Sequence, residues 1–344
     1  MLPGRSVSPA IPSDSVTQGN VLLTTHSVGH LVADGSQVAV TYPKATQACI
    51  ESWDPVVHSL TRYGAGGCWE PTYCCSLGAD GFVSFGLAGQ TIARMYFEHF
   101  AGLDIFDLYV STADRPTSVQ ITDVCPDNRY GDCLMPEGDL SGDGDLLVFD
   151  TWTESCANPS YPSACAKSPK KDGRLWRLDG THAVKVASGT GALTPLSVDA
   201  GRILVDHENG TLELLDRNGA SLHTYALDPA SVRGARLQGR DLVVTTPTAV
   251  EVTDADTGTF LRRWPLPADA KLTDLQDGIA VLVAGTDIHL LRLADGTDSV
   301  IHAPGTGPVL AQLEPAGLFY SYTADDPTYP GRVVFVPFAQ LPLR

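Results

Sequence analysis

Residues 210–227 read GTLELLDRNGASLHTYAL, residues 249–266 read AVEVTDADTGTFLRRWPL, and residues 288–303 read IHLLRLADGTDSVIHA. Each stretch is a short β-rich run, a turn that contains Asp and Gly, and a second β-rich run. This order is the pattern of a β-hairpin. Because the hairpins recur at nearly constant spacing, the chain is built from a repeated β unit.

Tight turns that contain Gly mark seven such units. The turns lie at residues 33–35, 88–90, 142–144, 199–201, 238–240, 276–278 and 315–317. Gly201 to Gly239 spans 38 residues, and the two following intervals, to Gly278 and then to Gly317, span 39 each. This length suits four short strands, which cannot bury both of their faces unless such units stack around an axis. The sequence therefore predicts an all-β, seven-bladed β-propeller of four-stranded antiparallel blades.

The three regular units can be divided into strands at their turn residues. In blade 4 we expect strands at 192–198, 202–206, 210–216 and 220–227; in blade 5 at 236–238, 242–246, 249–253 and 260–266; in blade 6 at 272–276, 279–284, 287–293 and 299–303. We name the strands of each blade A to D from the axis outward.

The last unit, residues 309–338, contains only three strands, which would leave an open edge. Residues 20–25 (NVLLTT) form a β-like run that belongs to no other blade. We expect this N-terminal strand to be the outer strand of blade 7 and to close the ring. Residues 1–19 would then be an extension, and residues 20–340 a single propeller domain.

The first three intervals are longer than the others, at 54, 55 and 57 residues. If each chain segment enters its blade along strand A from the top face, the B–C and D–A connections lie on that face, and the A–B and C–D turns lie below. The additional residues fall in 64–80, 125–136 and 153–172, which are all top-face connections of blades 1 to 3.

Composition limits the partners. The net charge is −17 and the isoelectric point is about 4.7, so a phosphate backbone or an anionic membrane surface would be repelled. The sequence has no apolar stretch of about 18 residues that could span a bilayer. We expect a monomer that binds a protein or a carbohydrate, and no nucleic acid.

Eight cysteines lie in the first half of the chain, all in or beside the long top-face connections: Cys49, Cys68, Cys74, Cys75, Cys125, Cys133, Cys156 and Cys165. Their even number and clustered spacing favour disulfides in an oxidising compartment. We therefore expect a secreted or extracytoplasmic protein (periplasm or cell surface), although residues 1–19 lack the features of an export signal.

Two disulfides would each close a short loop, Cys125–Cys133 and Cys156–Cys165. A bridge between the adjacent Cys74 and Cys75 would be strained. The other four cysteines could pair as Cys49–Cys74 with Cys68–Cys75, or as Cys49–Cys75 with Cys68–Cys74.

The repeats quoted above resemble those of the WD40-like, YVTN and quinoprotein-type propeller superfamily. Residues 140–149 (LSGDGDLLVF) resemble the TolB-type propeller repeat, which is found mainly in extracytoplasmic bacterial proteins. The resemblance implies the propeller architecture, which serves scaffolds, ligand-binding proteins and enzymes alike.

Polar and aromatic residues at the predicted top-face junctions are candidates for binding. They are His26, Glu98, His99, Asp206, His207, Glu208, Asp325 and Asp326, together with the aromatic residues Trp69, Tyr73 and Trp152. Histidines and carboxylates from several blades could converge on a divalent metal or a polar ligand. Aromatic side chains could stack on a sugar or anchor a protein.

The sequence contains neither a Gly-x-Ser-x-Gly elbow nor a phosphate-binding loop before a helix. The leading hypothesis is therefore an exported binding or scaffold protein that presents a disulfide-stapled top face of blades 1 to 3 to a protein or glycan. The alternative is a metal-dependent hydrolase or lyase with its site at the top of the axis. No cofactor is expected beyond that possible divalent metal.

Overall fold

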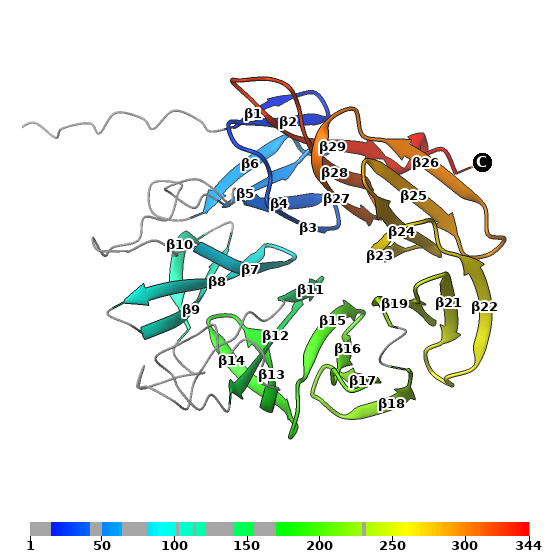
Figure 1. Cartoon of the computed structure of the whole chain (residues 1–344). Coiled ribbons are helices and arrows are strands. Elements are labelled where there is room, and N and C mark those ends of the chain that lie inside the picture. The colour runs from blue at the N-terminus through cyan, green and yellow to red at the C-terminus, as the bar shows by residue number, and fades with distance from the viewer. Residues whose placement is uncertain are drawn as a thin grey trace, which may run out of the picture.

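The structure is a computed structural model in which seven antiparallel sheets are arranged around a central axis (Figure 1). It describes residues 15–41, 50–63, 81–100, 103–112, 115–121, 140–154, 170–228 and 232–343. The only helix among them is the short 3-10 helix η2 (Phe338–Gln340). The predicted all-β, seven-bladed propeller is confirmed.

In each of the first three blades the four strands follow one another in chain order from the axis outward. Blade 1 contains β3 (His30–Asp34), β4 (Gln37–Thr41), β5 (Ile50–Asp54) and β6 (Ser59–Tyr63); blade 2 contains β7 (Gly81–Ala88), β8 (Thr91–Phe100), β9 (Leu103–Thr112) and β10 (Arg115–Gln120); blade 3 contains β11 (Ser141–Asp143), β12 (Leu146–Glu154), β13 (Lys170–Asp179) and β14 (His182–Ser188).

The next three blades follow the strands expected from the sequence to within two residues. Blade 4 contains β15 (Thr194–Asp199), β16 (Arg202–Asp206), β17 (Thr211–Asp216) and β18 (Ser221–Ala226); blade 5 contains β19 (Gly234–Gln238), β20 (Asp241–Thr245), β21 (Ala249–Asp254) and β22 (Phe260–Pro265); blade 6 contains β23 (Lys271–Gln276), β24 (Ile279–Ala284), β25 (Asp287–Arg292) and β26 (Asp298–His302).

Blade 7 is assembled from both ends of the chain. It contains β27 (Thr306–Glu314), β28 (Gly317–Thr323) and β29 (Gly331–Pro337), and β2 (Val21–Thr24) pairs with β29. The predicted closure by an N-terminal strand is confirmed. A fifth strand, β1 (Ser15–Gln18), pairs with β2 and forms the outer edge of this blade. β1 was not predicted from the sequence, because SVTQ is a short and mostly polar run within residues 1–19, which were expected to form an extension.

The hydrophobic core is divided among the seven interfaces between neighbouring blades. Seven clusters of buried apolar residues occur in the described part of the chain, one for each interface. Strand β24 shows how they form: Val281 packs toward blade 7 and Leu282 packs toward blade 5. Because successive side chains of a strand point to opposite faces, a strand between two blades must be apolar on both. The run IAVLVA therefore belongs inside the ring.

Candidate interaction surface and the lower ring

The upper ends of blades 2 and 3 are longer than those of the regular blades. Strands β8 and β9 have 10 residues each and continue in register to the pair Phe100 and Leu103, while β12 and β13 have 9 and 10 residues. The corresponding strands of blades 4 to 6 have 5 or 6 residues. At about 3.3 Å per residue, four additional residues extend a strand by about 13 Å.

This extension refines one expectation from the sequence. Glu98 and His99 were expected to end strand B of blade 2, beside its connection to strand C. They lie inside β8, where they pair with Ile105 and Asp104 of β9. Strand β8 continues beyond Phe97 to Phe100, and only residues 101 and 102 separate it from β9. The structure does not describe the side chains of Glu98 and His99.

The polar residues expected at the top of blade 4 bond to groups within their own blade. The ring Nε2 of His207 lies 2.9 Å from Oε2 of Glu213, which is on β17. Oδ1 of Asp206 accepts a hydrogen bond from the amide of Glu208, and Oε1 of Glu208 accepts one from the hydroxyl of Thr194. These contacts hold the short connection after β16 in place.

The polar residues expected at the top of blade 7 also bond within their own blade. Asp326 accepts hydrogen bonds from the amides of Thr328 and Tyr329 and pairs with Arg332 at 2.7 Å. The two backbone bonds, with the bond from Arg332, lower the pKa of Asp326 below its ordinary value. Asp325 is exposed to solvent.

His26 and Trp152 are the remaining described candidates. Nδ1 of His26 lies 3.0 Å from the hydroxyl of Thr25, and its carbonyl accepts a bond from Thr24. Trp152 is buried on β12. The expectations for Trp69, Tyr73 and all eight cysteines fall on residues outside the described ranges. Across the described ranges, no group of three or more His, Cys, Asp or Glu side chains is placed to hold a metal ion.

A second polar arrangement, which the sequence analysis did not predict, lies at the lower end of the inner strands. We call it the lower ring. It consists of the last residue of each inner strand: Asp34, Ala88, Asp143, Asp199, Gln238, Gln276 and Glu314. Four of these seven residues are carboxylates.

The side chains of the lower ring bond from one blade to the next. Four hydrogen bonds of this kind involve blades 3 to 7. The amide of Ala200 donates to Asp143 Oδ2 at 2.9 Å, and the amide of Gly239 donates to Asp199 Oδ2 at 3.0 Å. Gln238 Nε2 donates to Gln276 Oε1 at 2.7 Å, and the amide of Gly35 donates to Glu314 Oε2 at 2.9 Å. Blade 2 has Ala88 at this position, which offers no polar group. Asp34 makes the contact that Ala88 cannot make. Its Oδ2 accepts hydrogen bonds from the amide of Gly89 in blade 2 at 2.5 Å and from the amide of Gly144 in blade 3 at 3.0 Å.

Burial, together with neighbouring carboxylates, raises pKa values in and beside the lower ring. Burial, reinforced by the charges of Asp274, Asp34 and Asp143, raises the pKa of Glu314 to about 9. Burial also raises the pKa of Asp143 and of Asp274. A buried carboxyl beside like charges favours its neutral form, so Glu314 is protonated at neutral pH.

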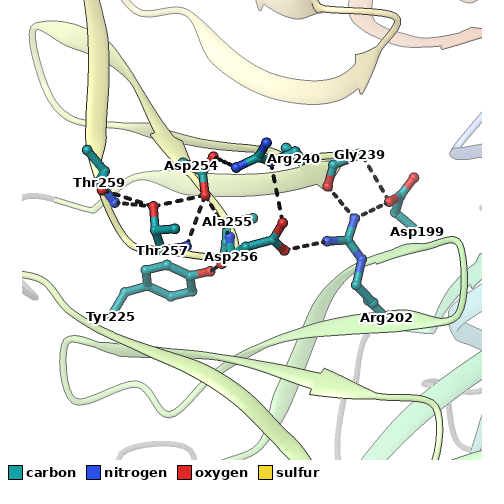
Figure 2. Close-up of polar contacts among 10 residues, drawn as sticks. All are labelled: Asp199, Arg202, Tyr225, Gly239, Arg240, Asp254, Ala255, Asp256, Thr257 and Thr259. Atoms are coloured by element: carbon teal, nitrogen blue, oxygen red, sulfur yellow. Dashed lines mark hydrogen bonds and ion pairs between the residues drawn. The ribbon is translucent and has the colours of Figure 1, made fainter.

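Polar contacts at the lower edge also join blades 4 and 5 (Figure 2). Arg202 binds Asp199 at 2.7 Å and lies 3.5 Å from Asp256, whose other oxygen lies 3.4 Å from Arg240. The Tyr225 hydroxyl donates to the carbonyl of Ala255, which is in the C–D turn of blade 5. Burial raises the pKa of Tyr225 to about 12. These contacts fix one blade against the next, which is a structural role.

Asp254 holds the C–D turn of blade 5 in the same view (Figure 2). Its Oδ1 accepts hydrogen bonds from the amide of Asp256 and from both the amide and the hydroxyl of Thr257. Its Oδ2 forms an ion pair with Arg240 at 2.6 Å. Although partial burial opposes ionisation, these hydrogen bonds and Arg240 lower the pKa of Asp254 overall. Asp54 and Asp216 end strand C of blades 1 and 4 and accept amide bonds in the same way.

Comparison with known proteins supports the fold. A chain in the crystal structure of a mitotic checkpoint complex superposes with a TM-score of 0.54 at 14% identity, covering 98% of this chain and 99% of that chain. The β-propeller domain of Myceliophteria thermophila Cps50 (Swd1) has a TM-score of 0.51 at 8% identity, with coverage of 94% and 99%. The WD40 β-propeller domain of Doa1 has a TM-score of 0.51 at 14% identity, with coverage of 94% and 98%.

The chain has the β-propeller fold. At these identities the likeness shows the fold alone, and neither a protein-family model nor a curated protein sequence matches the chain. Blade 1 does carry the two dipeptides typical of a WD40 repeat, Gly29-His30 at the start of β3 and Trp53-Asp54 at the end of β5. Both were overlooked when the sequence was considered alone. No helix in the described ranges is long and apolar enough to cross a bilayer.

Proposed function

We propose that this chain is a binding or scaffold module that uses the top face of blades 1 to 3 to hold a protein partner. The observation that supports this proposal is the asymmetry of the upper edge: blades 2 and 3 extend their B and C strands, while blades 4 to 6 keep them short. Connections that vary on a constant scaffold are where propellers and other repeat folds place their binding residues.

Trp69 and Tyr73, between blades 1 and 2, would supply the aromatic contacts. Aromatic residues dominate the binding energy of many protein interfaces. The WD40 propellers to which the chain is similar commonly bind proteins, which favours a protein over a carbohydrate. We also propose that the module is monomeric, works outside the cytoplasm, and has its upper connections stapled by disulfides between the cysteines named above.

A matched pair of surface variants tests the site. We expect a Trp69→Ala/Tyr73→Ala variant to lose a partner that the intact chain enriches from the fluid surrounding its source cells, measured by quantitative mass spectrometry. A lower-edge variant, Arg217→Ala/Asp145→Ala, should keep it, because both side chains are exposed on the opposite face. Retention by the first variant and loss by the second would contradict the proposal. A glycan array on the same proteins decides between a protein and a carbohydrate.

Two further measurements address the remaining expectations. Thiol labelling of the denatured, unreduced protein should find few free cysteines among the eight. Metal analysis should find no stoichiometric metal. A metal that is present in the intact protein and lost in a His207→Ala variant would contradict a pure binding module and favour the hydrolase or lyase alternative.

A further inference from the structure

The outer strand of blade 5 differs from the other described outer strands. β22 reads FLRRWP, and, as in β14 and β26, none of its residues is buried. Phe260 and Leu261 are adjacent and have exposed fractions of 57% and 44%. Arg262 and Arg263 follow them directly on a chain whose net charge is −17. The outer strands β14, β18 and β26 of blades 3, 4 and 6 each carry a single exposed large apolar residue: Val184, Leu222 and Val300.

Backbone groups of β22 face outward. β22 is the last strand of its sheet and pairs only with β21 among the described strands. The amide of Leu266 donates to the carbonyl of Thr248, which continues the register in which Arg263 lies opposite Glu251. Since bonded and non-bonded pairs alternate in an antiparallel ladder, the N–H and C=O of Arg263 point away from β21.

The two arginines lie on opposite faces of this edge. Arg262 donates to the carbonyl of Leu293 in blade 6, and Trp264 donates to the same carbonyl. Arg263 lies 3.6 Å from Glu251 on the other face and keeps 57% of its side chain exposed. A strand added here would therefore meet the outward N–H and C=O of Arg263, the carbonyl of Pro265, the charge of Arg263, and the exposed side chains of Phe260 and Leu261 beside the register shift between Phe260 and Arg262.

We propose that the edge of β22 binds an extended, acidic segment of a partner protein by strand addition, with Arg263 as the charge contact and Phe260 and Leu261 as the apolar contacts. Strand addition uses main-chain hydrogen bonds for affinity and alternate side chains for selectivity. This surface is separate from the top face in the proposed function, and either can fail without the other.

A second copy of this chain fits the edge poorly. In antiparallel pairing of β22 with itself about its outward-pointing residue, Arg263 of one copy would lie opposite Arg263 of the other. Like charges directly opposite each other destabilise a strand pair, and exposed cations are a common way in which proteins prevent edges from joining. Although the chain as a whole is acidic, screening limits its distant charges, and an acidic segment reverses the sign of the local interaction at Arg263. We therefore choose it as the occupant.

The experiment uses the full chain and a fluorescein-labelled nonapeptide of alternating Glu and Val, followed by fluorescence anisotropy at low salt. We expect saturable binding that weakens as salt is added, since the charges are exposed. Arg263→Glu should lower the affinity about tenfold, because an attractive exposed pair becomes a repulsive one. Lys185→Glu on β14 is the matched control, also exposed on an outer strand, and should change the affinity by less than about twofold.

Three further measurements make the result decisive. The same peptide with N-methyl groups on alternate residues should not bind, since it cannot complete the ladder. Phe260→Ser should weaken binding without changing the thermal midpoint, because its side chain is exposed. Absence of binding, equal loss in Lys185→Glu, or equal binding of the methylated peptide would overturn the proposal. So would a dimer in analytical ultracentrifugation that Arg263→Glu dissociates, which would make a second copy the occupant.

Discussion

The lower edge of the propeller is nearly the same in every blade, whereas the upper edge differs from blade to blade. Below, every inner strand ends in a Gly-containing turn, and side chains of the lower ring bond to the turn of a following blade. Above, the B and C strands have 5 or 6 residues in blades 4 to 6 and 9 or 10 in blades 2 and 3. The comparison indicates that the lower edge holds the ring together, while the upper edge can change without loss of the fold.

Removing the closing strand should have the largest effect. We expect deletion of residues 1–26 to lower the free energy of unfolding by about 3–5 kcal/mol, measured by urea denaturation, because it exposes the edge of β29 and removes the fully buried Leu22 from the core of blades 7 and 1. An unchanged melting temperature would show that the ring does not depend on this strand.

The fold could be predicted further than the site. The 39-residue spacing and the turn residues placed the strands of blades 4 to 6 within two residues, because each short strand is bounded by its own turn. The lower ring could not be predicted in this way. Asp34 bonds to Gly144, which is 110 residues away, and only the closed ring brings them together. The one usable signal was an acidic residue directly before a turn glycine, as in Asp34-Gly35 and Asp143-Gly144.

The top-face candidates illustrate a second limit of prediction from sequence. From the sequence, His207 and Asp326 could have converged with residues of other blades, and in the structure each bonds to residues of its own blade. Spacing along the chain identifies which junction a residue occupies and leaves the direction of its side chain undetermined. A pattern that places residues on one face is therefore weaker evidence than a pattern that places strands.

Two glycines in C–D turns at the lower edge differ in how closely a neighbouring blade packs against them. Gly219 has φ +85°, and a Cβ there would lie 1.9 Å from the carbonyl oxygen of Val186 in blade 3. Gly180 occupies the C–D turn of blade 3 with φ +61°, and a Cβ there would meet no described atom within 4 Å. We expect Gly219→Ala to cost about 2–4 kcal/mol of unfolding free energy and Gly180→Ala about 1 kcal/mol.

Both glycine variants carry the cost of a left-handed backbone, so their difference isolates the contact between blades 3 and 4. Urea denaturation of the two proteins under identical conditions gives that difference. Equal losses would mean that the turn shifts to accept the methyl group, and that blade contacts at the lower edge are less constrained than we infer.

A pH series tests the carboxylates of the lower ring. The pKa of Glu314 is about 9 in the folded chain and 4.5 ordinarily, so the folded state binds an additional proton between these values. The stability from this proton is complete below about pH 4.5 and is lost as the pH rises toward 9. We expect the stability of the unsubstituted chain to fall relative to Glu314→Gln by about 2 kcal/mol between pH 5 and about pH 6.5.

Groups around Glu314 define the control for this series. Asp274, Asp34 and Asp143 act on it by charge, and the amide of Gly35 donates to it. Asp145 is also near Asp143, but its side chain is 81% exposed. Asp145→Asn should therefore leave the pH dependence of the melting temperature unchanged. A parallel shift of both variants would mean that net charge, and not the ring, sets the pH dependence.

The smallest effects compare one aspartate on each edge. Oδ1 of Asp216 accepts from the amides of Asn218 and Ala220, both at 2.8 Å, so Asp216→Ala leaves two turn amides without this acceptor and should cost about 1 kcal/mol. Asp325 is exposed at the top of blade 7, and Asp325→Ala should change the unfolding free energy by less than about 0.5 kcal/mol. Since both substitutions remove one carboxylate from an acidic chain, general charge repulsion cancels in the comparison. A loss for Asp325→Ala as large as that for Asp216→Ala would show that the upper edge also stabilises the ring, and that its strand lengths vary for reasons of stability instead of binding.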